Sequence, residues 1–206
     1  MSVKTTLNYS PNFVFKKRKK KQIKFLIFHY TGMKRENEAI QKLTKIQSVV
    51  SVHYFVKKNG KIITMVPELY TAWHAGISKW GKYKFLNKNS IGIEISNPGH
   101  QFGYVNFSKQ QIKSLIKLSK FLISKYKIKK NCLLGHSDIA PDRKLDPGEK
   151  FPWMLLSQNK IGIWHNLGKK KLNFLRHKKV SDRENNLFMK NLRKLGYANT
   201  STFIKN

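Results

Sequence analysis

The segment that most restricts how this chain can fold is residues 135–148, with the sequence GHSDIAPDRKLDPG. Its two prolines and its closing glycine interrupt regular structure, so the sequence predicts a turn-rich loop and neither a helix nor a central strand. The loop carries three groups of different chemistry: His136, Lys144 and Asp146. Because loops on a rigid scaffold are common positions for binding sites, we interpret this one as a metal-holding loop, with an ordinary surface turn as the alternative.

Two predicted strands supply further polar groups. Residues 23–29, IKFLIFH, have the apolar run of a buried strand and deliver His29 at its end, before a turn at residues 30–32. Residues 90–96, SIGIEIS, alternate so that three isoleucines share one face while Glu94 lies on the other. We therefore expect Glu94 to point away from the apolar layer and into a cleft.

His29, His136 and Asp146 together offer two imidazoles and one carboxylate, a set that suits zinc. Three protein ligands leave one coordination position for water, which is the arrangement of catalytic rather than structural zinc sites. Glu94 would then be a base that does not bind the metal. Cys132 is the other side chain that zinc favours, but Asp146 completes the set, so we expect Cys132 to be a small buried residue of a strand.

Five motifs, taken in order along the chain, resemble one known family: Phe28-His29-Tyr30-Thr31, Val52-His53-Tyr54, Ala72-Trp73-His74-Ala75-Gly76, Asn87 with Ser90-Ile91-Gly92-Ile93-Glu94, and the loop from His136 to Gly148. They closely resemble the zinc-dependent N-acetylmuramoyl-L-alanine amidases of the type-2 amidase family, and within it the branch that includes AmiD and AmpD. Phage lysozyme-type amidases and peptidoglycan recognition proteins are relatives of that branch. The resemblance covers roughly residues 20–165 of this chain.

The resemblance implies a role for each residue of the site. The zinc ligands would be His29, His136 and Asp146, which hold one Zn²⁺ per chain. Glu94 would be the catalytic acid and base, and Lys144 would stabilise developing negative charge. The implied reaction is hydrolysis of the amide bond between N-acetylmuramic acid and L-alanine in peptidoglycan or muropeptides, in cell-wall turnover or recycling. The alternative is a peptidoglycan-binding protein of the same fold without turnover.

One position departs from the pattern of the family. Asp142 stands where the Ala-Pro-Gly-Arg-Lys stretch of the family usually has glycine. An extra anion at this position would either weaken the effect of Lys144 or point to solvent. Aspartate also tolerates the left-handed turn that glycine favours, so the loop can still form.

Four further residues are candidates for substrate contacts. Small residues flank Trp73 and His74, which suits a cleft wall where a sugar ring or a peptide lies, and a buried structural histidine is the alternative for His74. Asn87 and Asn97 are expected to donate hydrogen bonds to substrate carbonyls. His53 lies within a predicted strand, where we favour core packing or support of a ligand over ligation. The sequence assigns no role to the remaining histidines: His100, His165 and His177.

The net charge of +32 suggests a nucleic-acid partner, and the lysine-rich runs at residues 16–21 and 169–171 resemble basic patches. The excess is spread over the whole chain, however, and consists overwhelmingly of lysine alongside abundant asparagine and isoleucine. This pattern indicates compositional drift, so we expect no dedicated nucleic-acid partner. The charge would attract anionic wall polymers or substrates with free carboxylates, but charge alone names no substrate.

The periodicities along the chain predict a single catalytic domain of the α/β (α+β) class, with a central mixed sheet flanked by helices. A helix is expected over residues 36–50 with Ile46 on its apolar face. Strands are expected over residues 52–57 and 61–66, joined by a tight turn.

A second helix has a clearer beginning. Ser108 and Gln111 form a capping box, and an apolar stripe continues from there to about Tyr126. Residues 128–136 then return to the sheet as a strand, so helices and strands are mixed along the whole domain.

The two ends of the chain differ in composition from its middle. Residues 1–22 predict a flexible basic leader, residues 23–166 the catalytic domain, and residues 167–180 a lysine-rich linker. Residues 181–206 predict one helix with a capping box at its start, which we interpret as the remnant of a peptidoglycan-binding-type module.

No run of residues has the length of a membrane span, and the first 22 residues contain no apolar stretch of the kind found in signal peptides. These observations favour the cytoplasm, with the cell envelope or periplasm as the alternative. Nothing in the composition indicates an oligomer, so a monomer is expected.

Overall fold

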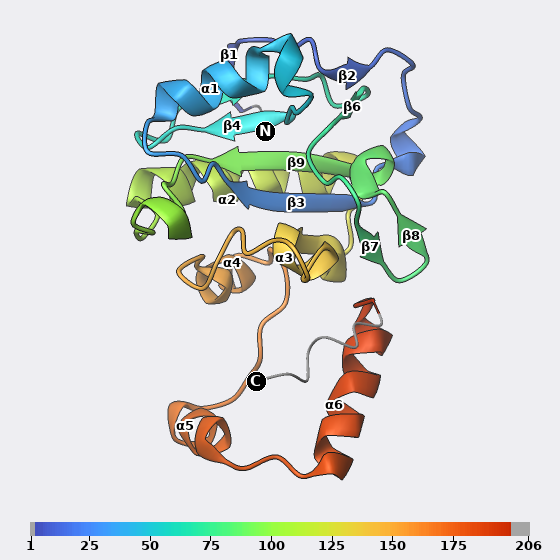
Figure 1. Ribbon diagram of the computed structural model, residues 1–206, viewed down its shortest axis with the longest axis vertical. Helices are drawn as coiled ribbons and strands as arrows, with labels where there is room; N and C mark the ends of the chain where they lie inside the picture. Colours follow the sequence, from blue (N-terminus) through green and yellow to red (C-terminus); the bar gives the residue numbers. More distant parts are fainter. Residues whose placement is uncertain (1–2, 199–206) are drawn as a thin grey trace.

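A computed structural model describes residues 3–198 of the protein. A six-stranded mixed sheet lies at its centre, with helices on both faces (Figure 1). In spatial order the strands are β1 (Thr6–Leu7), β5 (Ile62–Thr64), β4 (Tyr54–Val56), β9 (Ser90–Ile95), β3 (Phe25–Tyr30) and β10 (Leu133–Gly135). All neighbouring pairs are parallel except β5 with β4. This is the α/β fold with a central mixed sheet that the sequence predicts.

Further elements surround the main sheet. Two pairs of short strands lie outside it: β2 (Phe13–Val14) with β6 (Thr71–Ala72), and β7 (Lys79–Trp80) with β8 (Tyr83–Lys84). Between residues 3 and 198 the α-helices are α1 (Glu36–Thr44), α2 (Lys109–Tyr126), α3 (His136–Ile139), α4 (Trp153–Gln158), α5 (Lys169–His177) and α6 (Asp182–Leu195). Short 3₁₀ helices occur at residues 20–22, 46–48, 86–89, 100–102 and 130–132. None of the helices described is long and apolar enough to cross a membrane.

Helix α2 covers one face of the sheet (Figure 1). Its residues Leu115, Leu118 and Leu122 are fully buried there. The predicted capping box is present, because Ser108 Oγ accepts a hydrogen bond from Gln111 N at 3.1 Å and Gln111 Oε1 accepts one from Ser108 N at 2.9 Å. These two bonds satisfy amide groups that the first turn of a helix leaves without partners, and they define where α2 begins.

The alternation in β9 decides which of its side chains reach the site. Ile91, Ile93 and Ile95 are fully buried in the apolar cluster that α2 covers. Glu94 lies on the opposite face, as the period of two requires, and lines a cavity there. Two smaller apolar clusters, one under α1 and one beside α3, cover the rest of this second face.

Helix α1 is shorter than predicted. It ends at Thr44 instead of residue 50, and Ile46 is 62% exposed rather than packed on the face of the helix. The helix ends because the backbone of Lys45 is extended and its carbonyl accepts a hydrogen bond from Asn12 Nδ2 at 2.9 Å. The same carbonyl accepts a hydrogen bond from Ser48 N at 3.1 Å, so a local 3₁₀ turn and a partner from another part of the chain together replace the next hydrogen bond of the helix.

The segment before the metal-holding loop also differs from the prediction. β10 spans only residues 133–135, and Cys132 lies half-buried in a 3₁₀ turn that precedes it instead of within a strand. The loop itself begins with one helical turn, α3, in which Asp138 Oδ2 accepts a hydrogen bond from Gly135 N at 2.7 Å. The carboxylate caps this turn and allows a short helix where the prolines further along predict only a loop.

Residues 3–22 pack on the body of the protein instead of forming a flexible leader. β1 pairs with β5, β2 pairs with β6, and Arg18 in the middle of the lysine run is only 7% exposed. A hydrogen bond from Arg18 N to Leu69 O, 2.8 Å long, joins this segment to the body. The charged run therefore contains one cation that the tertiary structure buries.

Residues 167–198 form two helices, α5 and α6, which extend away from the sheet (Figure 1). Helix α5 occupies most of the predicted linker, residues 167–180. Helix α6 begins with the predicted capping box, and after its end the ring of Tyr197 packs on Trp80 with their centroids 4.7 Å apart. The last residues of the predicted module, 199–206, lie outside the described part of the chain.

Candidate metal centre and active site

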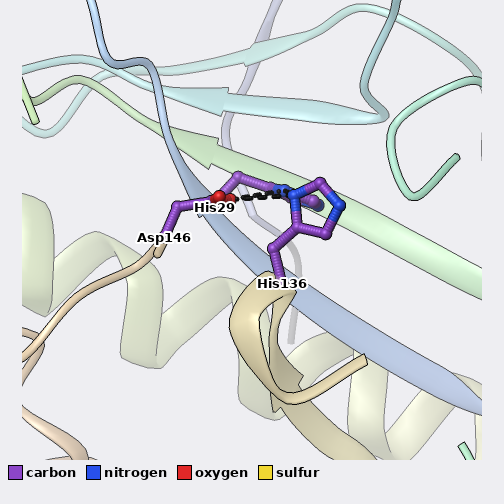
Figure 2. A group of neighbouring side chains, drawn as sticks. All are labelled: His29, His136 and Asp146. Carbon is purple, nitrogen blue, oxygen red and sulfur yellow. Dashed lines mark hydrogen bonds and ion pairs between the residues drawn. The ribbon is translucent and has the colours of Figure 1, made fainter. Parts of the chain in front are cut away.

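Three ligand atoms meet in a buried triangle between β3 and the loop after β10 (Figure 2). His29 Nδ1, His136 Nδ1 and Asp146 Oδ2 lie 3.0 Å from one another in all three pairs. The three residues are 3%, 4% and 7% exposed, respectively. Strand β3 carries His29, helix α3 begins with His136, and Asp146 follows in the loop. The structure therefore brings together the three residues that the sequence suggests as metal ligands.

Hydrogen bonds outside the triangle define the tautomer of His29. Ser90 Oγ donates to Leu86 O at 2.6 Å, so it accepts from His74 Nε2, which lies 3.1 Å away. His74 therefore carries its proton on Nε2 and offers Nδ1 to His29 Nε2 at 3.0 Å. His29 in turn carries its proton on Nε2, and its Nδ1 presents a lone pair to the triangle.

A backbone carbonyl defines the tautomer of His136. His136 Nε2 lies 3.2 Å from Ala75 O, and a carbonyl oxygen only accepts hydrogen bonds. The proton of His136 is therefore on Nε2, and Nδ1 presents a second lone pair to the triangle. Arg143 Nη2 donates to the same Ala75 carbonyl at 2.6 Å and helps to hold it in place.

The triangle fits a zinc ion. Two lone pairs and a carboxylate oxygen only 3.0 Å apart repel one another unless a cation lies between them. A tetrahedral site with ligands about 2.0 Å from zinc separates those ligands by about 3.3 Å, close to the spacing found. Burial, with a smaller contribution from His136, lowers the pKa of His29 to about 4, so its imidazole is neutral and able to bind a metal at neutral pH.

Asp146 is the charged member of the triangle. Burial, the largest single influence, raises the pKa of Asp146, and a cation between the three ligand atoms would outweigh burial. A bound metal would therefore keep the buried carboxylate ionised. Its main-chain carbonyl accepts a hydrogen bond from Ser137 N at 2.8 Å, which joins the loop back to the first turn of α3.

Glu94 lies beside His29 on the neighbouring strand. The two residues are register partners in the parallel pair of β3 and β9, and both line the same cavity. Burial raises the pKa of Glu94 to about 8, and the nearby carboxylate of Asp146 adds to the rise. A bound divalent cation would act in the opposite direction, so this carboxyl group is able to exchange a proton near neutral pH.

The cavity in front of the triangle has a volume of about 390 Å³, which is within the range of small-ligand sites. Besides the triangle and Glu94, its wall contains aromatic and cationic side chains: Tyr30, Trp73, His74, His100, Lys42, Arg143 and Lys144. Lys144 precedes Asp146 by two residues, and its positive charge partly opposes the rise in the pKa of Glu94 that burial causes. The cavity thus combines a candidate metal site, a candidate base and a cation.

Comparison with known proteins identifies the family. Residues 19–149 match the family model described as N-acetylmuramoyl-L-alanine amidase. This chain belongs to the N-acetylmuramoyl-L-alanine amidase family. It is 44% identical over 155 residues to N-acetylmuramoyl-L-alanine amidase AmiD of Escherichia coli, covering 69% of this chain and 55% of that protein. It is 38% identical over 108 residues to the 1,6-anhydro-N-acetylmuramyl-L-alanine amidase AmpD of Haemophilus influenzae, covering 52% of this chain and 56% of that protein. The chain spans about half the length of the curated relatives it matches.

Solved structures of amidases share the fold. The complex of E. coli AmiD with anhydro-N-acetylmuramic acid-L-Ala-D-gamma-Glu-L-Lys matches with a TM-score of 0.74 and 36% identity, over 88% of this chain and 74% of that one. AmpDh3 of Pseudomonas aeruginosa, in complex with an anhydromuramic pentapeptide, matches with a TM-score of 0.76 and 31% identity, over 88% of this chain and 77% of that one. The resemblance drawn from five sequence motifs is thus confirmed.

Two of the four predicted substrate contacts of this amidase-family chain, Trp73 and His74, line the cavity. Asn87 and Asn97 are not among the described residues of its wall. Asn87 Oδ1 accepts hydrogen bonds from the backbone amides of residues 74–75, and Asn97, 1% exposed, bonds to the backbone through both ends of its amide group. Both asparagines hold loops in place, and neither is among the described residues of the cavity wall, where the sequence suggested substrate contacts.

His53 and Asp142 both lie outside the triangle. His53 is fully buried and its Nδ1 accepts a hydrogen bond from Gly92 N at 3.0 Å, so it supports the sheet, as expected, although it lies just before β4 instead of within the predicted strand. Asp142 is exposed and is not among the cavity-lining residues described. Its φ is not positive, so this position does not require glycine. The departure from the family pattern therefore leaves Lys144 in the cavity wall.

The sequence gives no signal for the rim of the cavity. Tyr30 OH lies 2.8 Å from His100 Nδ1, and His100 Nε2 lies 2.9 Å from Glu149 Oε2. These contacts connect the 3₁₀ turn at residues 100–102 with the loop that carries Asp146. Because the partners are 49 and 70 residues apart, no local pattern in the sequence could have indicated them.

Proposed function

We propose that this chain hydrolyses the amide bond between N-acetylmuramic acid and the L-alanine of the stem peptide, in peptidoglycan or muropeptides. The observation that carries the proposal is the buried triangle of His29, His136 and Asp146, with Glu94 beside it in a cavity wall. Membership of the amidase family supports this reaction. So does the muropeptide in the complex of E. coli AmiD, a relative that shares the fold.

The proposed cofactor is one zinc ion per chain, with His29, His136 and Asp146 as ligands. When bound, zinc supplies a water molecule whose pKa is lowered to about 7 and polarises the scissile carbonyl group. His74 and the Ala75 carbonyl keep the two imidazoles in the ligating tautomer. Asp146 contributes the negative charge that favours a cation over a proton at this position.

Glu94 is the proposed acid and base. Its carboxylate takes one proton from the attacking water as the bond between oxygen and the carbonyl carbon forms. The carboxylic acid then gives that proton to the nitrogen of L-alanine as the carbon–nitrogen bond breaks. A pKa that burial raises to about 8 suits a group that must both accept and donate a proton near neutral pH.

Lys144 is the proposed stabiliser of the transition state. As the carbonyl carbon becomes tetrahedral, its oxygen gains negative charge, and a fixed cation in a water-poor site lowers the energy of that state. The Lys144 side chain lines the cavity and is close enough to Glu94 to affect its pKa. Trp73 and His74 supply a wall against which a sugar ring or a peptide can lie.

Two measurements test the proposal. Elemental analysis of the purified protein should find zinc, and incubation with a muropeptide should release the stem peptide. A protein that holds zinc and binds muropeptide without releasing the peptide would instead be the non-catalytic peptidoglycan-binding alternative. A protein that neither holds zinc nor binds muropeptide would refute both.

We further propose that the substrates are muropeptide fragments recycled in the cytoplasm, with intact wall in the cell envelope as the alternative. Relatives named 1,6-anhydro-N-acetylmuramyl-L-alanine amidase support the fragments. Initial rates on a 1,6-anhydro-muropeptide and on intact sacculi separate the two. A protein that is much faster on sacculi would overturn this preference.

We propose that residues 23–166, together with the packed residues 3–22, form the catalytic unit of a monomer and that α6 belongs to a peptidoglycan-binding-type module. Every group proposed for the chemistry lies between His29 and Asp146. Removal of residues 181–206 should therefore preserve turnover of small soluble muropeptides and affect stability or wall affinity instead. A truncated protein that is folded and holds zinc, yet fails on soluble substrate, would contradict this division.

A further inference from the structure

We propose that Asn87 is a positioning residue that holds both histidine ligands in the metal-binding tautomer, and that Arg18 keeps Asn87 in place. This inference rests on the metal site proposed above. Both residues lie outside the triangle. Arg18 also lies in a lysine-rich segment whose composition suggests only solvent-exposed charges.

A single oxygen atom of Asn87 controls the segment that contacts both ligands. Asn87 Oδ1 accepts hydrogen bonds from His74 N at 3.0 Å and from Ala75 N at 2.7 Å. The ring of His74 then accepts the Nε2 proton of His29, and the carbonyl of Ala75 accepts the Nε2 proton of His136. Movement of this segment would therefore affect both imidazoles at once.

Arg18 holds Asn87 through the main-chain carbonyl of that residue. Its Nη1 donates to Asn87 O at 2.9 Å, while Nε and Nη2 donate to Glu68 O at 3.1 Å and 2.9 Å. The planar guanidinium group thus connects two loops with fixed geometry, which a lysine ammonium cannot reproduce. Burial lowers the pKa of Arg18 to about 10, so the group remains charged at neutral pH and its donors stay available.

The tautomer matters because the metal requires one particular ring nitrogen. A neutral imidazole carries its proton on either nitrogen, and only the form with the proton on Nε2 leaves Nδ1 free to bind zinc. Partners that orient a ligating histidine from outside typically contribute about 10- to 100-fold in metal affinity. Since Asn87 acts on both histidines, the upper part of that range is expected on its loss.

The experiment compares three variants of the full chain. Asn87→Ala removes the acceptor and leaves two backbone amides without a partner, whereas Asn87→Asp keeps an acceptor oxygen in the same place. Asn89→Ala is the control, because Asn89 lies in the same 3₁₀ turn and its amide bonds only to Gln22 O among the described residues. Zinc affinity is measured by competition with a chromophoric chelator, and ¹⁵N–¹H long-range correlation spectra report the tautomers of the histidines in the metal-free protein.

The expected result is a loss of about 10- to 100-fold in zinc affinity for Asn87→Ala, restored by Asn87→Asp and absent in Asn89→Ala. Of these three variants, only Asn87→Ala should show mixed tautomers for His29 and His136 in the spectra. A merely structural role would lower the melting temperature and leave the tautomers unchanged. Unchanged tautomers, or a zinc affinity within twofold of the wild type, would overturn the inference.

A second variant covers the case in which Asn87→Ala does not fold. Arg18→Lys keeps the charge but loses the bridge between Asn87 O and Glu68 O, so it should produce the same change of tautomers in milder form. Arg183→Lys, on the exposed surface of α6, is its control. Arg18→Lys spectra identical to the wild type would refute the role of Arg18. If the wild type binds no zinc, the proposed metal centre fails, while the tautomers of the metal-free protein still decide this inference.

Discussion

Replacement of Gly92 by alanine would push His74 away from His29. A Cβ atom built on Gly92 lies 2.5 Å from His74 Cγ and 2.6 Å from His74 Nδ1, whereas about 3.5 Å is the closest comfortable approach of non-bonded carbons. The ring must therefore shift by about 1 Å, which strains or breaks its 3.0 Å hydrogen bond to His29 Nε2. Gly92 has no positive φ, so alanine adds no backbone strain and the steric contact is the main effect.

Two free energies follow from this contact. Overpacking of a filled site costs about 1–3 kcal/mol, and replacement of a strand glycine offsets about 0.5–1 kcal/mol of it, so the free energy of unfolding should fall by about 0–2.5 kcal/mol. Loss of the partner that orients His29 should weaken zinc binding about 10- to 100-fold, which is about 1.4–2.8 kcal/mol. At the midpoints of these ranges, the loss in metal affinity, about 2.1 kcal/mol, exceeds the loss in stability of the metal-free protein, about 1.2 kcal/mol.

Zinc affinity would be measured by competition with a chelator, and stability by urea unfolding of the metal-free protein. Gly168→Ala is the matched control, because nothing lies within 4 Å of a Cβ added at Gly168 and its φ is not positive. A Gly92→Ala protein that binds zinc as tightly as the wild type would refute the argument that His74 orients His29.

Three other predictions concern the ligands, the base and the response to acid. Asp146→Ala should lower zinc content and activity together, because only two imidazoles remain to hold the metal. Cys132→Ser should keep its zinc, because Cys132 lies outside the triangle. Elemental analysis of both variants decides which residues are the ligands. Glu94→Gln should keep the metal and lower kcat about 10²- to 10⁴-fold in single-turnover cleavage of a muropeptide, and undiminished cleavage by the zinc-replete variant would remove Glu94 from the mechanism. Burial alone would raise the pKa of Glu68, but hydrogen bonds from Lys125 and two tyrosines outweigh it, so its folded-state pKa lies below the ordinary value of 4.5. The stability that Glu68 contributes is therefore present above that value and is lost as the pH falls toward the folded-state pKa. Between pH 7 and about pH 3, the free energy of unfolding in urea should fall less steeply for Glu68→Gln than for the wild type. Equal falls in the two proteins would contradict this.

Features that depend on neighbouring residues could be predicted from the sequence. The alternation in β9 places three isoleucines against α2 and Glu94 in the cavity, because successive side chains of a strand point to opposite faces. The capping box of Ser108 and Gln111 marks the start of α2 for the same local reason. The loop after His136 could be recognised because its prolines and its mixture of side chains lie within fourteen residues.

Features that depend on distant partners could not be predicted. A run of lysines is ordinarily solvated, but Arg18 is buried where the carbonyls of Glu68 and Asn87, 50 and 69 residues away, accept its hydrogen bonds. Asn87 illustrates the same limit, because a polar residue near a site motif suggests contact with substrate, while the structure directs its amide oxygen to the backbone. The early end of α1 also depends on a remote side chain, Asn12.

The topology of the sheet explains why functional residues from distant parts of the chain meet. β9, β3 and β10 are adjacent and parallel, so their carboxyl ends lie at one edge, where ligands bind in open sheets of this kind. His29 and Glu94 each occupy the fifth position of a six-residue strand, and His136 directly follows β10. The hydrogen bond from Ser137 N to Asp146 O then closes the loop, so that Asp146 lies beside the other two ligands. The site is therefore a consequence of strand direction and one loop closure.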